Sequence, residues 1–229
     1  MPSPVIKTLA EAVARRGSEP LLTWYDPLTS ARTELSVRTF ANWVDKTANL
    51  LRDLDAENSV VVGPLSLSHP GHWMSLLWPL AAWQAGCRYS TTPSGEAEVV
   101  VTGPKPQPFP VLTTIACSLH PLGLPLAGLP EDVLDFSSAA LAQPDQHIAT
   151  RVDRDAIAWV DADRQVKHSE LLADPTSGRV LVAARTPWQA LSEAVLRPLA
   201  GGGSAVVVDG PADAQLLARI AAAEHATMA

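Results

Sequence analysis

The chain has 229 residues, of which 47% are hydrophobic and 18% charged, which is enough apolar surface for the core of one large domain or two small ones. Its formal net charge is -7 and no basic cluster exceeds the pair Arg15-Arg16, so a nucleic-acid-binding surface and a patch for anionic membranes are excluded. Because the sequence shows neither a signal-peptide pattern nor an apolar stretch of about 20 residues, we expect a soluble, cytoplasmic protein without membrane insertion.

The first sixty residues contain helix and strand patterns in clear alternation. Apolar residues recur at helical spacing over 5–13, which predicts a helix. Segments 21–25 and 33–35 flank a turn-forming Asp-Pro pair, so they predict a β-hairpin. Ser36 follows directly and can cap the next helix, whose apolar stripe runs over 40–51.

The middle of the chain opens with a β-branched run at 59–63, which is typical of a buried parallel strand. A helix is predicted over 71–85, where Pro79 should kink the helix or remove a backbone hydrogen bond. Further strands are expected at 88–90, 98–102 and 111–116, and a short acidic helix at 130–141.

Strands and helices alternate more regularly after residue 155. The elements expected there are strands at 156–160, 179–184 and 204–208, a helical turn at 169–173, and helices at 188–199 and 211–223, the last with Asp209 as its cap and Pro211 in its first turn. Segments 60–90 and 180–208 share one order of strand, Pro-containing loop, Trp, helix and strand, which indicates two similar lobes. Strands separated by single helices imply βαβ units with right-handed crossovers.

The predicted fold class is α/β, with largely parallel sheets and βαβ units in two lobes. A polar, turn-prone segment at 143–153 is the best candidate for an internal boundary. We therefore expect a single α/β domain over 1–229, with sub-lobes at 1–146 and 152–229.

Several residues invite a chemical role and were weighed against simpler interpretations. Cys87 and Cys117 are expected to be buried free thiols, because two cysteines cannot define a disulfide framework in a chain of this size. His69 and His72 could share a metal ion, but no third ligand lies near them in sequence, which favours solvated loop histidines. The run Gly201-Gly202-Gly203-Ser204 lacks the final glycine of a nucleophile elbow, so it indicates a helix cap and a turn.

Four carboxylates form a loose acidic group without the glycine turn and closing Glu of a calcium loop, so they are expected to be solvated turn residues: Asp153, Asp155, Asp161 and Asp163. The sequence therefore assigns no catalytic, cofactor-binding or metal-binding residue and no cofactor. Seven tryptophans are an unusual number; most should lie in the core, and some could face a protein partner. Three of them, Trp73, Trp78 and Trp83, should spread around one helix.

A set of short strand and turn motifs recurs in a defined order along most of the chain. The set comprises Leu22-Thr23-Trp24, Thr33-Glu34-Leu35-Ser36, the helix from Phe40 to Leu51, Val60-Val61-Val62, Trp73, Leu80-Ala81, Gly86, Pro198-Leu199, Gly201-Gly202-Gly203-Ser204 and Val206-Val207-Val208. In order and spacing these motifs resemble the opening part of adenylate-forming enzymes, which include acyl-CoA synthetases and the adenylation domains of peptide synthetases. The chain also resembles a small bacterial family of stand-alone proteins of about this length, similar to these enzymes and without a settled function.

The resemblance implies a phosphate-binding loop rich in Ser, Thr and Gly between the strand at 156–160 and the helix near residue 170. Here the segment 159–168 has no glycine, and Asp161 and Asp163 stand where backbone amides should approach the phosphates. At an effective dielectric constant near 20, one misplaced unit charge about 4 Å from a phosphate costs on the order of 4 kcal/mol.

Three basic residues near this segment do not restore the loop. Arg164 and Lys167 offset part of the negative charge but do not supply bare amides. His168 matches a histidine common just after the family's loop, and we interpret it as a helix-start or packing residue. The family's adenine, ribose, magnesium and catalytic-lysine residues are implied to lie beyond the position that matches Ala229.

Three functions are therefore considered. The first is a non-catalytic remnant of an adenylate-forming enzyme that acts as a binding or interaction protein, with a homodimer or another protein as partner and an unknown small-molecule ligand. The second is an acyl-, CoA- or nucleotide-binding module. The third is an acyl-activating enzyme completed by another chain. The missing phosphate loop places the non-catalytic interpretation first.

Overall fold

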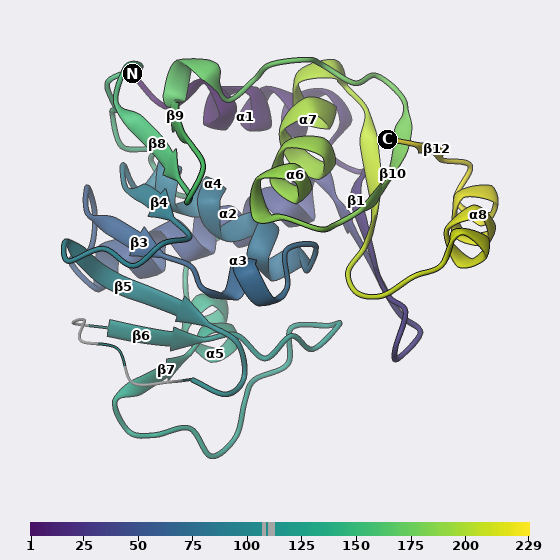
Figure 1. The fold of residues 1–229 in the computed structure, drawn as a ribbon. Coiled ribbons are helices and arrows are strands. Elements are labelled where there is room, and N and C mark those ends of the chain that lie inside the picture. The colour runs from purple at the N-terminus through teal and green to yellow at the C-terminus, as the bar shows by residue number, and fades with distance from the viewer. Residues whose placement is uncertain (107–108, 110–112) are drawn as a thin grey trace.

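Two β-sheets with helices packed between them make up the fold (Figure 1). The structure, a computed structural model, describes residues 1–106, 109 and 113–229. The predicted α/β class with largely parallel sheets is confirmed.

The five-stranded sheet contains strands from both ends of the chain. Its spatial order is β12 (Thr227–Met228), β10 (Arg179–Ala183), β11 (Ser204–Val208), β1 (Pro20–Asp26) and β2 (Ala31–Ser36). All neighbours are parallel except β1 and β2, which form the predicted antiparallel hairpin. Strand β11 is almost wholly buried because helices cover both faces of the sheet, as its β-branched run predicts.

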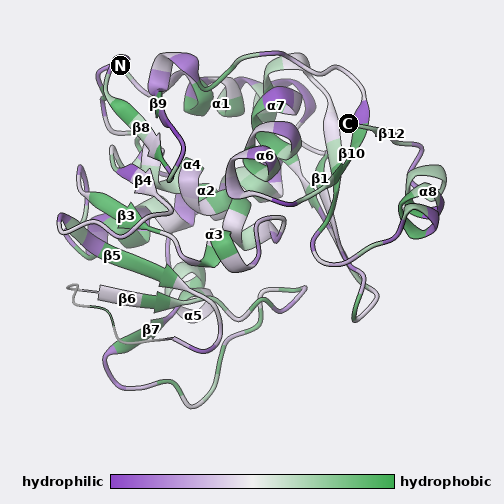
Figure 2. Ribbon diagram, in the orientation of Figure 1, coloured by the Kyte–Doolittle hydropathy of each residue, from purple (hydrophilic) through white to green (hydrophobic). Residues whose placement is uncertain are grey.

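The seven-stranded sheet has the order β7 (Val133–Asp135), β6 (Thr113–Ala116), β5 (Ala97–Thr102), β3 (Val60–Val62), β4 (Arg88–Ser90), β8 (Ile157–Val160) and β9 (Gln165–Lys167). Its strands are parallel except for the antiparallel pair β8 and β9. Strands β3 and β5 are hydrophobic along most of their length (Figure 2). The predicted strand at 111–116 is described from Thr113 onward, and Val111 and Leu112 lie outside the described residues.

The helices are α1 (Pro4–Arg16), α2 (Val37–Asp53), α3 (Leu65–Ser68), α4 (Trp73–Gln84), α5 (Phe136–Leu141), α6 (Pro187–Leu191), α7 (Arg197–Gly201) and α8 (Ala214–Ala223), with a 3-10 turn at His168–Glu170 and a π-helical segment at Ser192–Leu196. The predicted cap of α2 is present, since the Ser36 hydroxyl accepts a hydrogen bond of 3.1 Å from the Thr39 amide. The helix predicted at 188–199 is continuous through α6, the π segment and α7, which ends at the left-handed Gly202. None of the described helices is both long and apolar enough to cross a membrane.

Helix α4 lies at the centre of the molecule and is buried along its whole length. Its tryptophans Trp73, Trp78 and Trp83 are at most 2% exposed, so the prediction that they lie in the core is confirmed. A helix that is apolar on every side must be buried on every side, which explains why the three indoles form no single stripe. The indole of Trp83 donates to the Ala158 carbonyl at 2.7 Å, which ties α4 to the seven-stranded sheet.

The two sheets do not coincide with the expected sub-lobes at 1–146 and 152–229. Strands β1 and β2, from the first segment, belong to the sheet that holds β10, β11 and β12 of the second segment. Conversely, β8 and β9 of the second segment belong to the sheet formed by β3 to β7 of the first. The reason is that strand pairing joins segments by their buried faces and hydrogen bonds, not by their separation in sequence. The polar connector at 143–153 is instead fastened to α2, where the Asn49 amide donates to the carbonyls of Pro144 and Gln146, each at 3.0 Å.

Two helix predictions were wrong at their N-terminal ends. The segment 130–141 forms strand β7 before helix α5, whose cap is Asp135. The last helix begins at Ala214 and is capped by Asp213, so Pro211 lies outside it. Asp209, the predicted cap, instead accepts a hydrogen bond from the Gly71 amide.

Candidate functional site

Residues 157–167, where the resemblance to adenylate-forming enzymes implies a phosphate loop, form a tight β-hairpin. Strand β8 ends at Val160 and turns directly into β9, with Val160 paired to Gln165. The Asp161 amide donates to the Arg164 carbonyl at 3.0 Å, and the Asp163 amide donates to the Asp161 carboxylate at 2.9 Å. Both amides are therefore engaged inside the turn.

The hairpin is also held against helix α6 by aromatic contacts. The Asp161 carboxylate accepts from the indole of Trp159 at 3.0 Å and pairs with the Arg164 guanidinium at 3.2 Å. That guanidinium lies 5.8 Å above the ring of Trp188, which in turn contacts Trp159 at 5.5 Å between ring centroids. An Arg–Trp–Trp stack thus links the seven-stranded sheet to α6. We call these four residues the hairpin stack: Trp159, Asp161, Arg164 and Trp188.

His168 has the packing role that its position predicts. Its side chain is buried at the start of the 3-10 turn, and Nδ1 lies 2.9 Å from the Ser3 hydroxyl. Burial lowers the pKa of the imidazole to about 4, so the ring is neutral near pH 7. It packs edge-on against Trp83, which is typical of a core histidine.

A cavity of about 470 Å³ opens at the carboxyl edge of the five-stranded sheet, where β1, β10 and β11 end. We call it the carboxyl-edge cavity. Most of its wall is apolar, formed by Trp24, Leu28, Leu67, Pro70, Leu119 and Pro211. Ligand sites in open parallel sheets lie at the carboxyl ends of the strands, and apolar walls with a few polar groups are typical of them.

One carboxylate in the wall of this cavity is that of Asp209, which follows β11 directly. Its amide donates to the Tyr25 carbonyl at 3.0 Å, and its Oδ1 accepts from the Gly71 amide at 3.0 Å. The side chain is only 6% exposed. Gly71 has to be a glycine here, because a Cβ atom would lie 2.7 Å from the Cβ of Ala184 and 2.8 Å from a methyl of Val207.

His69 and His72 line the same cavity but differ in environment. His72 is 1% exposed, so the expectation of a solvated loop histidine was wrong for this residue. It caps α4: Nδ1 accepts from the Met74 amide at 3.1 Å, and Nε2 donates to the Leu119 carbonyl at 3.2 Å. Burial lowers the pKa of His72 to about 4. His69 is 44% exposed, with Nδ1 at 3.7 Å from Asp209 Oδ2.

Neither the paired histidines nor the acidic turns form a metal centre in the part of the chain that the structure describes. Asp153 and Asp161 each accept an amide two residues later, which is the turn role that their positions predict. Cys87 and Cys117 are buried free thiols, as predicted, and burial raises the pKa of Cys117 to about 12.

Comparisons with known proteins place the chain in a family. No family model matches it. The TIGR03089 family protein of Mycobacterium tuberculosis (strain ATCC 25618 / H37Rv) is 30% identical over 221 residues, which cover 88% of each chain. The chain belongs to the TIGR03089 family.

Solved structures of longer proteins share the fold of this chain. The acyl-CoA synthetase of Brucella canis matches 99% of this chain with 47% of its own, at 17% identity and a TM-score of 0.78. The benzoate CoA ligase from Burkholderia xenovorans LB400 matches 94% of this chain with 47% of its own, at 14% identity and a TM-score of 0.65. The acetoacetyl-CoA synthetase from Streptomyces lividans matches 90% of this chain with 38% of its own, at 16% identity and a TM-score of 0.70. The chain spans less than half the length of these structures. Its fold is that of the N-terminal half of adenylate-forming enzymes.

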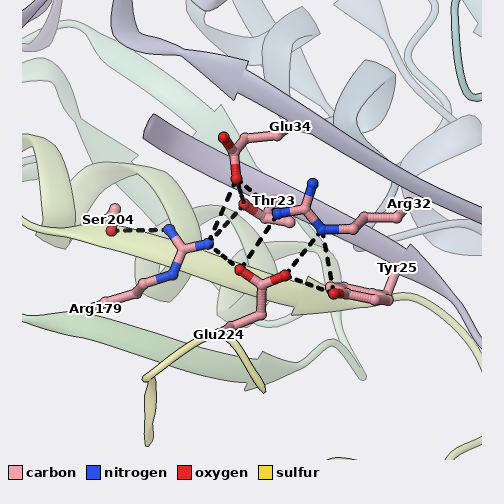
Figure 3. A network of polar contacts seen from close by, with 7 residues as sticks. All are labelled: Thr23, Tyr25, Arg32, Glu34, Arg179, Ser204 and Glu224. Atoms are coloured by element: carbon pink, nitrogen blue, oxygen red, sulfur yellow. Dashed lines mark hydrogen bonds and ion pairs between the residues drawn. The ribbon is translucent and has the colours of Figure 1, made fainter. Parts of the chain in front are cut away.

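A polar cluster lies on the face of the five-stranded sheet that α8 packs against, at the C-terminal end of that helix. Figure 3 shows its side chains. Its seven members are Thr23, Tyr25, Arg32, Glu34, Arg179, Ser204 and Glu224. Glu224 is central: it accepts from Arg179 at 2.6 Å, from Arg32 at 2.8 Å and from the Tyr25 hydroxyl at 2.5 Å. Every acidic group in this cluster is paired with an arginine, so we assign it to stability.

Sequence reasoning missed the carboxyl-edge cavity. Trp24, Gly71 and Asp209 come together there from three separate parts of the chain. One signal was present: Asp209 directly follows the buried run 204–208, and a polar residue at the end of a parallel strand is placed at the ligand edge. The assignment of Asp209 as a helix cap hid that signal.

Proposed function

We propose that this protein is a non-catalytic binding protein built on the N-terminal fold of adenylate-forming enzymes. The observation that carries the proposal is the β8–β9 hairpin, which lies where the resemblance to adenylate-forming enzymes implies a phosphate loop. A triphosphate needs several backbone amides pointing outward from small residues. In this turn the amides of Asp161 and Asp163 are hydrogen-bonded within the hairpin, so they are not free to bind phosphate.

The charges of the hairpin support the same proposal. Arg164 is the nearest candidate for holding phosphate, but it pairs with Asp161 and lies over Trp188. Recruiting it would break an ion pair and uncover an aromatic face. It would also leave the Asp161 carboxylate, whose side chain is 13% exposed, without its cation.

The binding role is assigned to the carboxyl-edge cavity. Its volume of about 470 Å³ is within the usual range for small-molecule sites, roughly 300–1,000 Å³, and its apolar wall surrounds a few fixed polar groups. It lies at the carboxyl ends of three parallel strands, which is where open α/β sheets bind ligands. A protein partner, including a second copy of the chain, is compatible with this role.

Calorimetric titration with Mg·ATP tests the proposal directly. We expect no saturable binding below about 1 mM, whereas the full-length Brucella canis acyl-CoA synthetase serves as the positive control in the same buffer. Tight binding of ATP or AMP, with a Kd below about 10 µM, would overturn the proposal. Soaking nucleotide into crystals provides the structural counterpart, since phosphates held by the hairpin would contradict it.

Two further measurements separate the alternatives. A melting-temperature increase with acyl-CoA or AMP would support a module that binds those ligands. Pyrophosphate exchange with candidate acids, measured with the chain alone and with any co-purified partner, tests for an enzyme completed by another chain. Absence of exchange in both samples removes that alternative.

A further inference from the structure

The carboxyl-edge cavity carries more negative than positive charge. Two carboxylates, Asp26 and Asp209, line it with one exposed guanidinium, that of Arg185. His72 is neutral near pH 7, because burial holds its pKa at about 4. The side chains that line the cavity therefore favour a positively charged ligand over a negatively charged one.

Asp209 is the carboxylate that is open to a ligand. Its side chain is more than nine-tenths buried, and Oδ1 is occupied by the Gly71 amide. Among the described residues, no donor hydrogen-bonds to Oδ2; the nearest basic group is Nδ1 of His69, at 3.7 Å. Oδ2 is not one of the fully buried atoms that lack a partner, so it faces the open cavity and can accept a hydrogen bond from a ligand there.

Asp26 contributes negative potential without offering a free oxygen. Its Oδ1 accepts from the Leu28 amide at 2.8 Å and its Oδ2 from the Thr29 hydroxyl at 2.6 Å, so the turn fixes the carboxylate at the cavity wall. Both carboxylates thus repel an anion, and Oδ2 of Asp209 remains able to accept a hydrogen bond from a ligand.

We propose that the carboxyl-edge cavity binds a small amphipathic amine, whose ammonium group donates to Oδ2 of Asp209 while its apolar body packs against Trp24 and Leu119. This inference rests on the proposed binding function of the cavity. An ammonium group supplies the donor and the positive charge that Asp209 lacks. A neutral alcohol supplies only the donor, and a carboxylate ligand adds a third negative charge next to two others.

Three probes of one shape test the proposal: 2-phenylethylamine, 2-phenylethanol and phenylacetate. Binding is measured at pH 7 by NMR titration of the backbone amides, with the Gly71 and Gly210 signals as reporters of the cavity. We expect the amine to bind at least tenfold more tightly than the alcohol, and phenylacetate more weakly than either. The Asp209→Asn variant should lose at least tenfold of the amine affinity and change the alcohol affinity by less than threefold.

The asparagine variant keeps the shape of the side chain and an oxygen for the Gly71 amide, and a thermal melt verifies its fold. Asp163→Asn, at an exposed carboxylate of the hairpin turn, is the matched control and should leave all three affinities unchanged. Equal affinities for amine and alcohol in the native protein, or no binding of the amine below about 10 mM, would overturn the amine assignment whatever the variant does. Neither outcome bears on whether the protein binds ATP. The amine assignment and the proposed non-catalytic function are therefore tested by different measurements.

Discussion

Glu224 provides the sharpest test of the electrostatics that hold α8 on the five-stranded sheet. Replacing it by glutamine keeps the side chain's shape but removes the charge that pairs with Arg179 at 2.6 Å and Arg32 at 2.8 Å (Figure 3). Burial by itself would raise the pKa of the Glu224 carboxyl, but hydrogen bonds from Arg32, Tyr25 and Arg179 outweigh that effect and lower the pKa to about 2.

The magnitude follows from this lowered pKa. Each pKa unit corresponds to about 1.4 kcal/mol, so a change from the ordinary 4.5 to about 2 sets an upper limit of about 3.5 kcal/mol. Solvent screens part of this, because the Arg32 side chain is 42% exposed. We therefore expect Glu224→Gln to lower the free energy of unfolding by about 2 kcal/mol at pH 7. For a chain of this size that lowers the Tm by roughly 4–8 °C.

The pH dependence gives the sign. Because the folded-state pKa is lower than the unfolded one, the contribution of Glu224 is fully present above about pH 4.5 and is lost as the pH falls towards 2. At pH 3 less than half of the difference between native and variant protein should remain. Urea unfolding followed by tryptophan fluorescence at pH 7 and pH 3 measures both values, with Glu131→Gln at an exposed glutamate as the control. A loss below about 0.5 kcal/mol at pH 7, or an equal loss at both pH values, would refute the reasoning.

Three further predictions concern packing. Gly71→Ala should lower the free energy of unfolding by about 2 kcal/mol, because the new methyl group meets Ala184 and Val207 below 3 Å. Gly95→Ala, where nothing lies within 4 Å of an added Cβ, should be nearly neutral in the same urea assay, and similar losses for both would count against the clash. Trp188→Leu should cost about 1–3 kcal/mol and release the hairpin stack, seen as faster hydrogen exchange of the Asp161 amide, which is bonded to the Arg164 carbonyl; unchanged exchange there would contradict the stack. The two buried cysteines should react with a thiol reagent only as the protein unfolds, and labelling of the native protein at the rate of a free thiol would contradict their burial.

The β8–β9 hairpin contributes to the packing of the whole fold. The hairpin stack joins the seven-stranded sheet to α6 through Arg164 and Trp188, so the segment that would hold phosphate instead contributes to the packing of the fold. Building a glycine-rich loop at 161–164 would therefore remove these stabilising contacts.

Local patterns in the sequence predicted most elements correctly. The helix at 5–13, the hairpin, the helix capped by Ser36 and the strands at 59–63 and 204–208 depend on periodicity, turn chemistry and capping, which involve residues close in the chain. The α/β class follows from the same kind of information, whereas the departure from a phosphate loop at 159–168 rests on the resemblance to adenylate-forming enzymes. Strand β9 was missed because three residues are too few for a periodic pattern.

The tertiary structure alone decided which segments meet. Strand β1 pairs with β11, more than 180 positions later in the chain, and Asp209 meets Gly71 across 138 positions. His72 looks like a loop histidine in sequence and is buried only because the Leu119 loop and Trp24 close over it. Such contacts depend on the packing of whole elements against one another, to which no short stretch of sequence is specific. The elements could therefore be predicted from the sequence, whereas the cavity and the place of Asp209 in its wall exist only in the folded chain.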